Sequence, residues 1–243
     1  MRDKGLKYRS KVGAAPGTLV VHPELAQLPV IMTLMAFDAT TFADYTISDP
    51  TEVIAYLGKY PVIWLNICGV GDIDILNKIT TIFNLNVLAM EDVVNVHQRP
   101  KVEEYDKIYF AVSKIPEVIN LQLSMQQLSM FWGENFVITF TEKATNCFTP
   151  LIARLKHGGR RANLARPEYL AYAISDTVLD SFFPLLDDYG TRLDELEERA
   201  IDNPSTWVIR HIHSFKHELN VMRRAVWSQR NAMGNFKEIV SQD

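Results

Sequence analysis

The first two thirds of the chain alternate short apolar runs with segments whose apolar positions recur every three or four residues. Runs rich in β-branched side chains predict strands, and the three-to-four spacing is typical of amphipathic helices. The predicted strands lie within residues 17–22, 28–39, 61–67, 101–115, 120–133 and 134–142. The predicted helices lie within residues 48–60, 72–84, 87–95 and 147–159. Such alternation, followed by consecutive strands, indicates a mixed sheet covered by helices.

Local signals support several of these elements. Asp49 is a suitable helix N-cap, and Pro50 behind it suits the first helical position. The sequence Trp-Gly-Glu-Asn at residues 132–135 is a tight-turn signal, so the strands on its two sides are expected to form a hairpin. Gly158 and Gly159 are expected to end the helix before them.

From Arg166 onward the pattern is helical. Residues 166–202 predict one helix that bends at Pro184 and Gly190, and Ser205 can cap the helix that follows. The spacing of seven and three residues between three leucines predicts a coiled-coil seam: Leu186, Leu193 and Leu196. Residues 166–200 carry 3 Arg against 9 Asp or Glu, and residues 201–243 carry 6 Lys or Arg against 4 acids. Opposite net charges favour an antiparallel helical hairpin, although two separate surface helices would show the same pattern.

Composition restricts the function. The 243 residues are 47% hydrophobic with a net charge of -4, which describes a globular chain without the basic face that nucleic-acid binding requires. Cys68 and Cys147 have no metal-site spacing, and Cys68 ends an apolar run as a buried residue would. The N-terminus lacks the apolar region of a secretory signal, and no apolar run approaches the roughly 20 residues of a membrane span.

Glu91 and Asp92 are the most informative polar pair. They are adjacent, and the sequence Asn-Val-His-Gln-Arg-Pro follows at residues 95–100. Two neighbouring carboxylates repel each other, which favours a cation between them, and hard oxygen ligands suit Mg²⁺, Ca²⁺ or Mn²⁺. The alternative is structural: acids on a short helix, or an ion pair with Arg99 or Lys101. The residues alone leave both interpretations open.

Other motifs give weaker signals. The sequence Gly-Val-Gly-Asp at 69–72 follows a strand and precedes a helix, but Asp74 occupies the third glycine position of a dinucleotide loop. His213 and His217 share a helix face with His211 nearby, as zinc ligands can, yet an ordinary polar face is the simpler interpretation. The chain shows neither a nucleophile motif nor an acid–base pair, so we do not expect an enzyme.

The longest motifs together resemble the CorA family of magnesium and cobalt transport proteins. The resemblance runs from about Pro16 to Phe236. It is carried by APGTLVVH, by WLNICGVGDIDILNKITTIFNLNVLAMEDVVNVHQRPKVEEYDKIYFAV, by EYLAYAISDTVLDSFFPLLDDYGTRLDELEERAIDNP and by FKHELNVMRRAVWSQR. The most specific part is EDVVNVHQRPKVEEYD.

The resemblance implies an α-β-α sandwich, an α+β fold with a mixed parallel and antiparallel sheet between helical layers. A long antiparallel helical hairpin follows. The implied division is a flexible arm at 1–16, an α/β domain at 17–165 and the hairpin at 166–243. In the family a stalk helix and membrane spans come next, and the assembly is a homopentameric channel. This chain is therefore expected to be a soluble fragment of a protein on the cytoplasmic face of the cell membrane, monomeric or weakly associated by itself.

The family also implies a use for the acidic pair. Its cytosolic domains bind divalent cations between protomers, which carries the role of metal ligand to Glu91, Asp92 and Asp176, with Asp180 as a weaker candidate. An essential Asp lies on the neighbouring subunit's stalk helix. Bound Mg²⁺, which Co²⁺ or another divalent cation can replace, is expected to favour the closed channel. The Met-Gly-Asn-Phe sequence at 233–236 resembles the family's Gly-Met-Asn pore signature by coincidence only.

Two alternatives to a magnesium sensor stay open. The same fold serves a related zinc transporter, and the histidines of the last helix are compatible with it. The other alternative is a soluble interaction module that uses this fold without transport.

Overall fold

The computed structural model describes residues 15–120, 122–158, 164–202 and 205–240, with side chains described as far as Gly234. Its centre is a seven-stranded sheet with the order β2-β1-β3-β7-β6-β5-β4. The strands are β1 (Ile31–Phe37), β2 (Phe42–Ile47), β3 (Val62–Cys68), β4 (Lys101–Tyr105), β5 (Ile108–Ile119), β6 (Gln122–Trp132) and β7 (Phe136–Thr141). Among the strands of the described residues, β3 and β7 alone pair in parallel, and the other neighbouring pairs are antiparallel. The predicted mixed sheet is confirmed.

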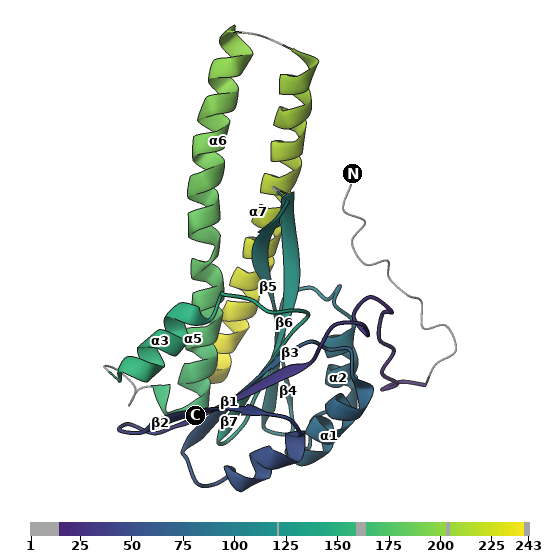
Figure 1. Ribbon diagram of the computed structural model, residues 1–243, viewed down its shortest axis with the longest axis vertical. Coiled ribbons are helices and arrows are strands. Elements are labelled where there is room, and N and C mark those ends of the chain that lie inside the picture. The colour runs from purple at the N-terminus through teal and green to yellow at the C-terminus, as the bar shows by residue number, and fades with distance from the viewer. Residues whose placement is uncertain (1–14, 121, 159–163, 203–204, 241–243) are drawn as a thin grey trace.

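Helices cover both faces of the sheet (Figure 1). The first face of the sheet is covered by the 3₁₀ helix η1 (Pro50–Ala55), by α1 (Ile73–Phe83) and by α2 (Val87–Val94). An apolar core fills the space between these helices and the sheet. On the second face lie α3 (Thr149–His157) and α5 (Pro167–Asp180), which enclose a second core around the buried Trp64 and Trp132. The sheet is therefore the middle layer of an α-β-α sandwich.

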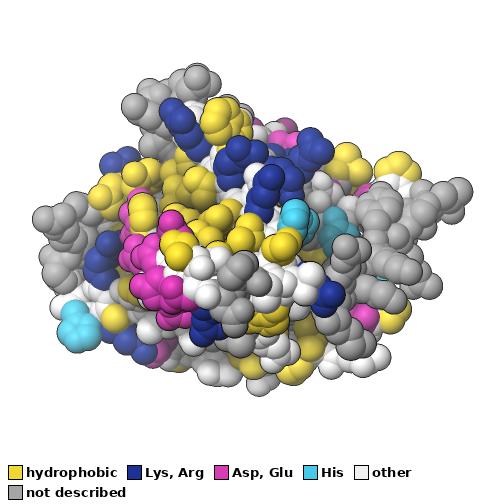
Figure 2. All heavy atoms as spheres, turned by 90° about the horizontal axis from the view of Figure 1, so that it is seen from above, with side chains coloured by type: hydrophobic (Ala, Val, Ile, Leu, Met, Phe, Trp, Pro, Cys, Tyr) yellow, Lys and Arg dark blue, Asp and Glu magenta, His cyan; other side chains and the backbone are white. Residues whose placement is uncertain are grey.

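Two long helices, α6 (Phe182–Asp202) and α7 (Thr206–Val240), form the expected antiparallel hairpin, which projects beyond the sandwich (Figure 1). Tyr189 and Phe215 are buried between them, and Leu123 and Met125 of the long β6 strand pack against the same cluster. Figure 2, a view from above, shows acidic and basic side chains gathered in separate groups. The C-terminal part of α7 returns to the sheet and packs on β4 and β5.

Three expectations about the secondary structure were wrong in detail. Residues 17–22 form no strand, because β2 already pairs with the outer edge of β1, and Leu19 and Val21 cover the core without joining the sheet. The break between α5 and α6 falls at Ser181, because Pro184 lacks the N–H that a continuous helix would need, while α6 runs straight on through Gly190.

The third error concerns the leucine seam. Leu196 is buried and Leu193 half-buried in the hairpin, but the side chain of Leu186 is 42% exposed. The expected arm at 1–16 lies almost wholly outside the described residues. The division into parts at 17–165 and 166–243 stays a prediction, and α5, which follows that boundary, packs on the sheet itself.

Candidate metal site

Helix α2 fixes the position of the acidic pair. Asn86 caps its N-terminus by accepting hydrogen bonds from the N–H groups of Leu88 and Ala89. The buried residues of the helix face the first core: Ala89, Met90, Val93 and Val94. Glu91 and Asp92 stand on the remaining arc of the helix, where both are half-buried. The periodicity that buries one face therefore leaves both carboxylates at the surface of the same turn.

Asp92 is surrounded by donors from its own chain. Its carboxylate accepts a hydrogen bond from Gln98 Nε2 at 2.6 Å and one from Lys101 Nζ at 2.8 Å. Lys101 also donates to Glu103 at 2.6 Å, and Glu103 accepts a bond from the Tyr105 hydroxyl. The ion pair with Lys101 that the sequence offered as one alternative is confirmed, while the role of Asp92 as a metal ligand stays a prediction. Lys101 itself keeps a raised pKa, because its two carboxylate partners outweigh its burial.

A second set of contacts fixes the backbone at Asp92. The buried Gln127 side chain donates to the Asp92 carbonyl oxygen at 2.8 Å. The Gln127 side-chain oxygen accepts hydrogen bonds from the backbone N–H of Gln98 and from Lys114 Nζ. Neither Gln98 nor Gln127 was singled out in the sequence. Gln127 lies 35 positions after Asp92, and in the sequence it is one more residue of a predicted strand. Helix α2 ends at Val94, within the predicted range of 87–95, and a loop leads from it to β4.

Glu91 points to a different neighbour. Its Oε2 accepts a hydrogen bond from the backbone N–H of Gly17 at 3.0 Å. The N-terminal segment is thereby held against α2, and Gly17, with a φ of 83°, lies close to Val87. The two adjacent carboxylates therefore have separate partners within one chain.

Asp176 and Asp180 are exposed on α5, one helical turn apart. That helix covers the second face of the sheet, whereas α2 covers the first (Figure 1). A single chain does not bring Asp176 to Glu91 and Asp92. Accordingly, the described residues contain no group of three or more His, Cys, Asp or Glu that could hold a metal ion. The carboxylates have the hard oxygen chemistry that Mg²⁺ prefers, but they fit it only as separate contributors to a shared site.

The remaining sequence candidates have structural explanations. A Cβ atom on Gly69 or Gly71 would lie 2.4 Å from the Pro29 carbonyl oxygen or 2.3 Å from that of Leu25. These glycines therefore permit close backbone contact, and Asp72 behind them caps α1. His213 and His217 are exposed on α7. The ring centroid of His211 lies 3.7 Å from that of Trp207, with the two rings tilted by 31°.

Both cysteines are only partly buried, contrary to the full burial expected of Cys68. Desolvation raises both thiol pKa values, that of Cys147 to about 11, which keeps them protonated and unreactive near neutral pH. The Met-Gly-Asn-Phe sequence begins inside α7, and its Asn235 and Phe236 side chains lie outside the described residues.

Within the described residues, no helix is both long enough and apolar enough to cross a membrane. Sequence comparison finds similarity to the cobalt/magnesium transport protein CorA of Thermotoga maritima, 29% identical over 238 residues, covering 97% of this chain and 67% of that protein. A putative metal ion transporter of Bacillus subtilis, YfjQ, is 28% identical over 151 residues, covering 62% of this chain and 46% of that protein.

Solved structures share the fold. The complete CorA magnesium transporter of Methanocaldococcus jannaschii matches with a TM-score of 0.71 at 16% identity, covering 87% of this chain and 64% of that one. Its soluble domain matches with a TM-score of 0.67 at 16% identity, over 85% and 78% of the two chains. The ZntB cytoplasmic domain of Vibrio parahaemolyticus matches with a TM-score of 0.63 at 14% identity, over 88% and 82%.

This chain spans about two thirds of the Thermotoga and Methanocaldococcus proteins and about half of the Bacillus protein. The family model described as CorA-like Mg²⁺ transporter protein matches residues 62–242, three quarters of the chain. With the α-β-α sandwich and its helical hairpin in place, this match shows that the chain belongs to the CorA-like Mg²⁺ transporter family.

Proposed function

We propose that this chain is the cation-sensing regulatory part of a Mg²⁺ or Co²⁺ channel and works at the cytoplasmic face of the membrane. In this proposal Glu91, Asp92 and Asp176 bind divalent cations between neighbouring copies of a homopentamer. The cations favour the closed channel, and their loss when Mg²⁺ falls releases it. Membership of a transporter family supports this role over an enzymatic one.

The observation that carries the proposal is the separation of the acids. The acidic pair and Asp176 lie on opposite faces of one sheet, and each stands at the surface. Mg²⁺ keeps several waters and needs only one or two carboxylates, so ligands from two copies of the chain suffice. A site divided in this way binds its cation only when copies are correctly arranged. Cation binding and arrangement are then thermodynamically linked, as a sensor requires.

Lys101 gives this site a resting state. Its ammonium group neutralises Asp92 within the protomer, so the Asp92 carboxylate stays paired when the cation leaves. An incoming Mg²⁺ must replace that contact, which lowers the apparent affinity and shifts the response to higher Mg²⁺ concentrations. Lys101 can turn to Glu103, which it already contacts, when the cation takes over.

Calorimetric titration of Mg²⁺ into this chain, combined with sedimentation, tests the proposal. We expect binding in the millimolar range or Mg²⁺-dependent association, both lost in the Glu91→Ala/Asp92→Ala variant and weakened by Asp176→Ala. The matched control is Glu197→Ala/Glu198→Ala, which removes an adjacent, exposed acidic pair from α6. Full-length channels with the same changes should lose closure by Mg²⁺. Unchanged gating in the Glu91/Asp92 variant of the full-length channel would overturn the proposal.

A zinc-transporting relative is the second candidate, favoured by the likeness to the ZntB domain and by the exposed His213 and His217 one turn apart on α7. A parallel Zn²⁺ titration distinguishes the two. Zn²⁺ binding that is lost in His213→Gln/His217→Gln but kept in the acidic-pair variant would favour the zinc candidate. A common response of Mg²⁺ and Co²⁺ to the acidic-pair variant alone would favour the first.

A further inference from the structure

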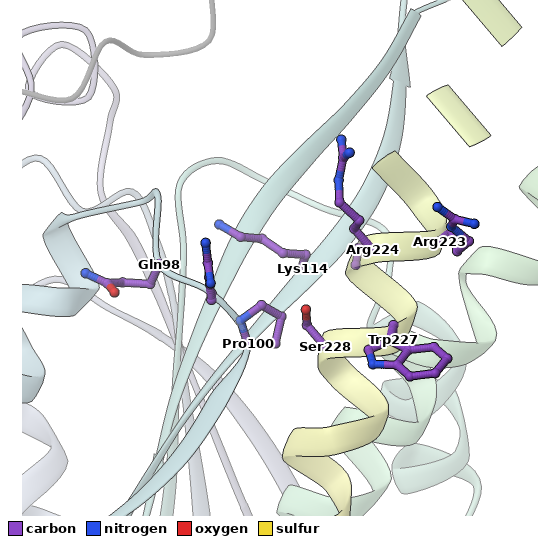
Figure 3. A pocket seen from close by; sticks show the side chains of 9 residues that line it. Gln98, Pro100, Lys114, Arg223, Arg224, Trp227 and Ser228 are labelled. Atoms are coloured by element: carbon purple, nitrogen blue, oxygen red, sulfur yellow. The ribbon is translucent and has the colours of Figure 1, made fainter. Parts of the chain in front are cut away.

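A groove runs between α7 and the loop that leads from α2 to β4, and it adjoins the candidate metal site through Gln98. Its volume is about 710 Å³, within the range of pockets that hold small ligands. Gln98, Arg99 and Pro100 line it from the loop, Lys114 from β5, and five residues of α7 from Arg223 to Ser228. We call it the basic groove. Figure 3 shows Arg224 and Ser228 projecting from α7, with Pro100 and Lys114 across from the helix.

The lining is strongly positive. It contains Arg99, Lys114, Arg223 and Arg224, and none of the described residues that line the groove is acidic. Within the part of the chain that the structure describes, the three guanidinium groups form no ion pair with a carboxylate. Three guanidinium groups along one groove stand out in a chain whose net charge is -4, whereas the ammonium group of Lys114 is directed to the Val96 carbonyl oxygen and to Gln127. Such a concentration of positive charge attracts anions.

The groove also has a rigid base. The N–H of Lys114 donates to the buried Gln229 side chain at 3.1 Å, which fixes α7 against β5 directly beside Ser228. The Gln229 Nε2 atom is buried and has no hydrogen-bond partner among the described residues. Lys114 Nζ is held by the Val96 carbonyl oxygen at 2.8 Å and by Gln127. The three guanidinium groups are therefore carried by a loop and a helix whose positions are set by buried contacts.

Trp227 adds an aromatic surface. It lines the groove, and its indole is 64% exposed, although an indole normally gains by burial. Guanidinium groups bind phosphate oxygens in a bidentate manner, and an exposed indole stacks on planar rings. We propose that the basic groove binds a phosphorylated ligand of nucleotide size, with its phosphates on Arg99 and Arg224 and its base against Trp227.

Calorimetric titrations in EDTA test the proposal without any contribution from divalent cations. The three probes are ATP, inorganic tripolyphosphate and adenosine. We expect ATP to bind most tightly, tripolyphosphate to bind more weakly and adenosine not to bind. The affinity for ATP should fall as salt is added, because the phosphate contacts are electrostatic. Adenosine that binds as well as ATP, or no binding of ATP up to roughly 10 mM, would overturn the proposal.

Variants locate the ligand. Arg99→Gln/Arg224→Gln should weaken ATP and tripolyphosphate by about tenfold or more. Trp227→Ala should weaken ATP by about fivefold or more and leave tripolyphosphate unchanged. The matched control, Arg210→Gln/Lys216→Gln, removes the same charge from exposed positions of α7 outside the groove and should bind ATP as the unmodified chain does. Equal binding by all variants with unchanged circular dichroism would contradict the assignment to this groove.

Discussion

The ammonium group of Lys101 lies 2.8 Å from a carboxylate oxygen of Asp92, a residue on a different element nine positions earlier. Both side chains are half-buried, with 28% of Lys101 and 22% of Asp92 exposed. The most conspicuous metal-ligand candidate of the sequence is thus already paired with a cation from its own chain. A divalent cation that binds Asp92 must therefore compete with the ammonium group of Lys101.

Removing the ammonium group of Lys101 should strengthen Mg²⁺ binding at Glu91 and Asp92. Replacement by a neutral side chain of similar length, Lys101→Met, should raise the affinity of the acidic pair for Mg²⁺ by about two- to fivefold. Thermal unfolding at increasing Mg²⁺ concentrations measures it, because a ligand that binds only the folded state raises the melting temperature. The control is Lys143→Met, which breaks an ion pair of the same length with Glu117 elsewhere. Weaker Mg²⁺ binding in Lys101→Met would mean that Lys101 orients Asp92 rather than competing for it.

The core of the sheet contains a buried polar chain that should be sensitive to deletion. Trp64 Nε1 donates to the Thr139 hydroxyl at 2.9 Å, and that hydroxyl donates to Asn66 at 2.8 Å. Trp64 and Thr139 are fully buried. Thr139→Val keeps the shape but leaves the indole N–H without a partner, so the free energy of unfolding should fall by about 1–3 kcal/mol in urea titrations. Thr139→Ser keeps the hydroxyl and should lose less; equal losses would show that the methyl group matters, not the hydrogen bond.

Replacement by alanine should change the stability of the chain in opposite directions at a glycine of the β3–α1 loop and at one of α6. Gly71→Ala places a Cβ atom against the Leu25 carbonyl oxygen, a backbone atom that cannot turn aside, so the free energy of unfolding should fall by about 2 kcal/mol or more. Gly190 lies within α6, and a Cβ atom added there would meet no other part of the chain within 4 Å, so Gly190→Ala should raise stability by roughly 0.5–1 kcal/mol. Chemical denaturation of both variants measures the contrast, and stabilisation by Gly71→Ala would contradict the close contact.

Lys114 should make stability depend on pH above 8. Burial lowers its pKa from the ordinary 10.5 to about 8 in the folded chain. Between these values the unfolded chain binds more protons, so the contribution of Lys114 to stability rises as pH increases from 8 to 10.5. The stability difference between the unmodified chain and Lys114→Met should change in that direction by at most about 3 kcal/mol. A difference that stays constant from pH 7 to 10.5, measured by urea titration at each pH, would show that Lys114 titrates normally.

Elements specified by neighbouring residues were predicted well from the sequence. The cap at Asp49 and the proline behind it are confirmed, and Glu52 completes a capping box. The β6–β7 hairpin is confirmed because its turn residues lie next to one another in the chain. The adjacency of Glu91 and Asp92 singled out the acidic pair, and the structure places both outside the buried face of α2. The metal role that the family resemblance gives them stays a prediction.

Features that depend on distant residues were not predictable. The parallel pairing of β3 with β7 and the support of Asp92 by Gln127 join segments whose sequences carry no mark of each other. The basic groove arises because the end of α7 returns to β4 and β5, more than 100 residues after them, so no local pattern could show its cations together. The metal ligands stay a prediction for the same reason, since their proposed assembly needs a second chain.

The parallel β3–β7 pair has a consequence for synthesis on the ribosome. Ile63 of β3 pairs with Phe136 of β7, 73 positions later. At translation rates of about 5–20 residues per second, β3 waits roughly 4–15 s for that neighbour. During this interval its apolar run, Val-Ile-Trp-Leu-Asn-Ile-Cys, is covered on one side by β1 and open on the other. An uncovered strand edge invites pairing with other chains, so the newly made protein is most prone to aggregation before residue 136 emerges.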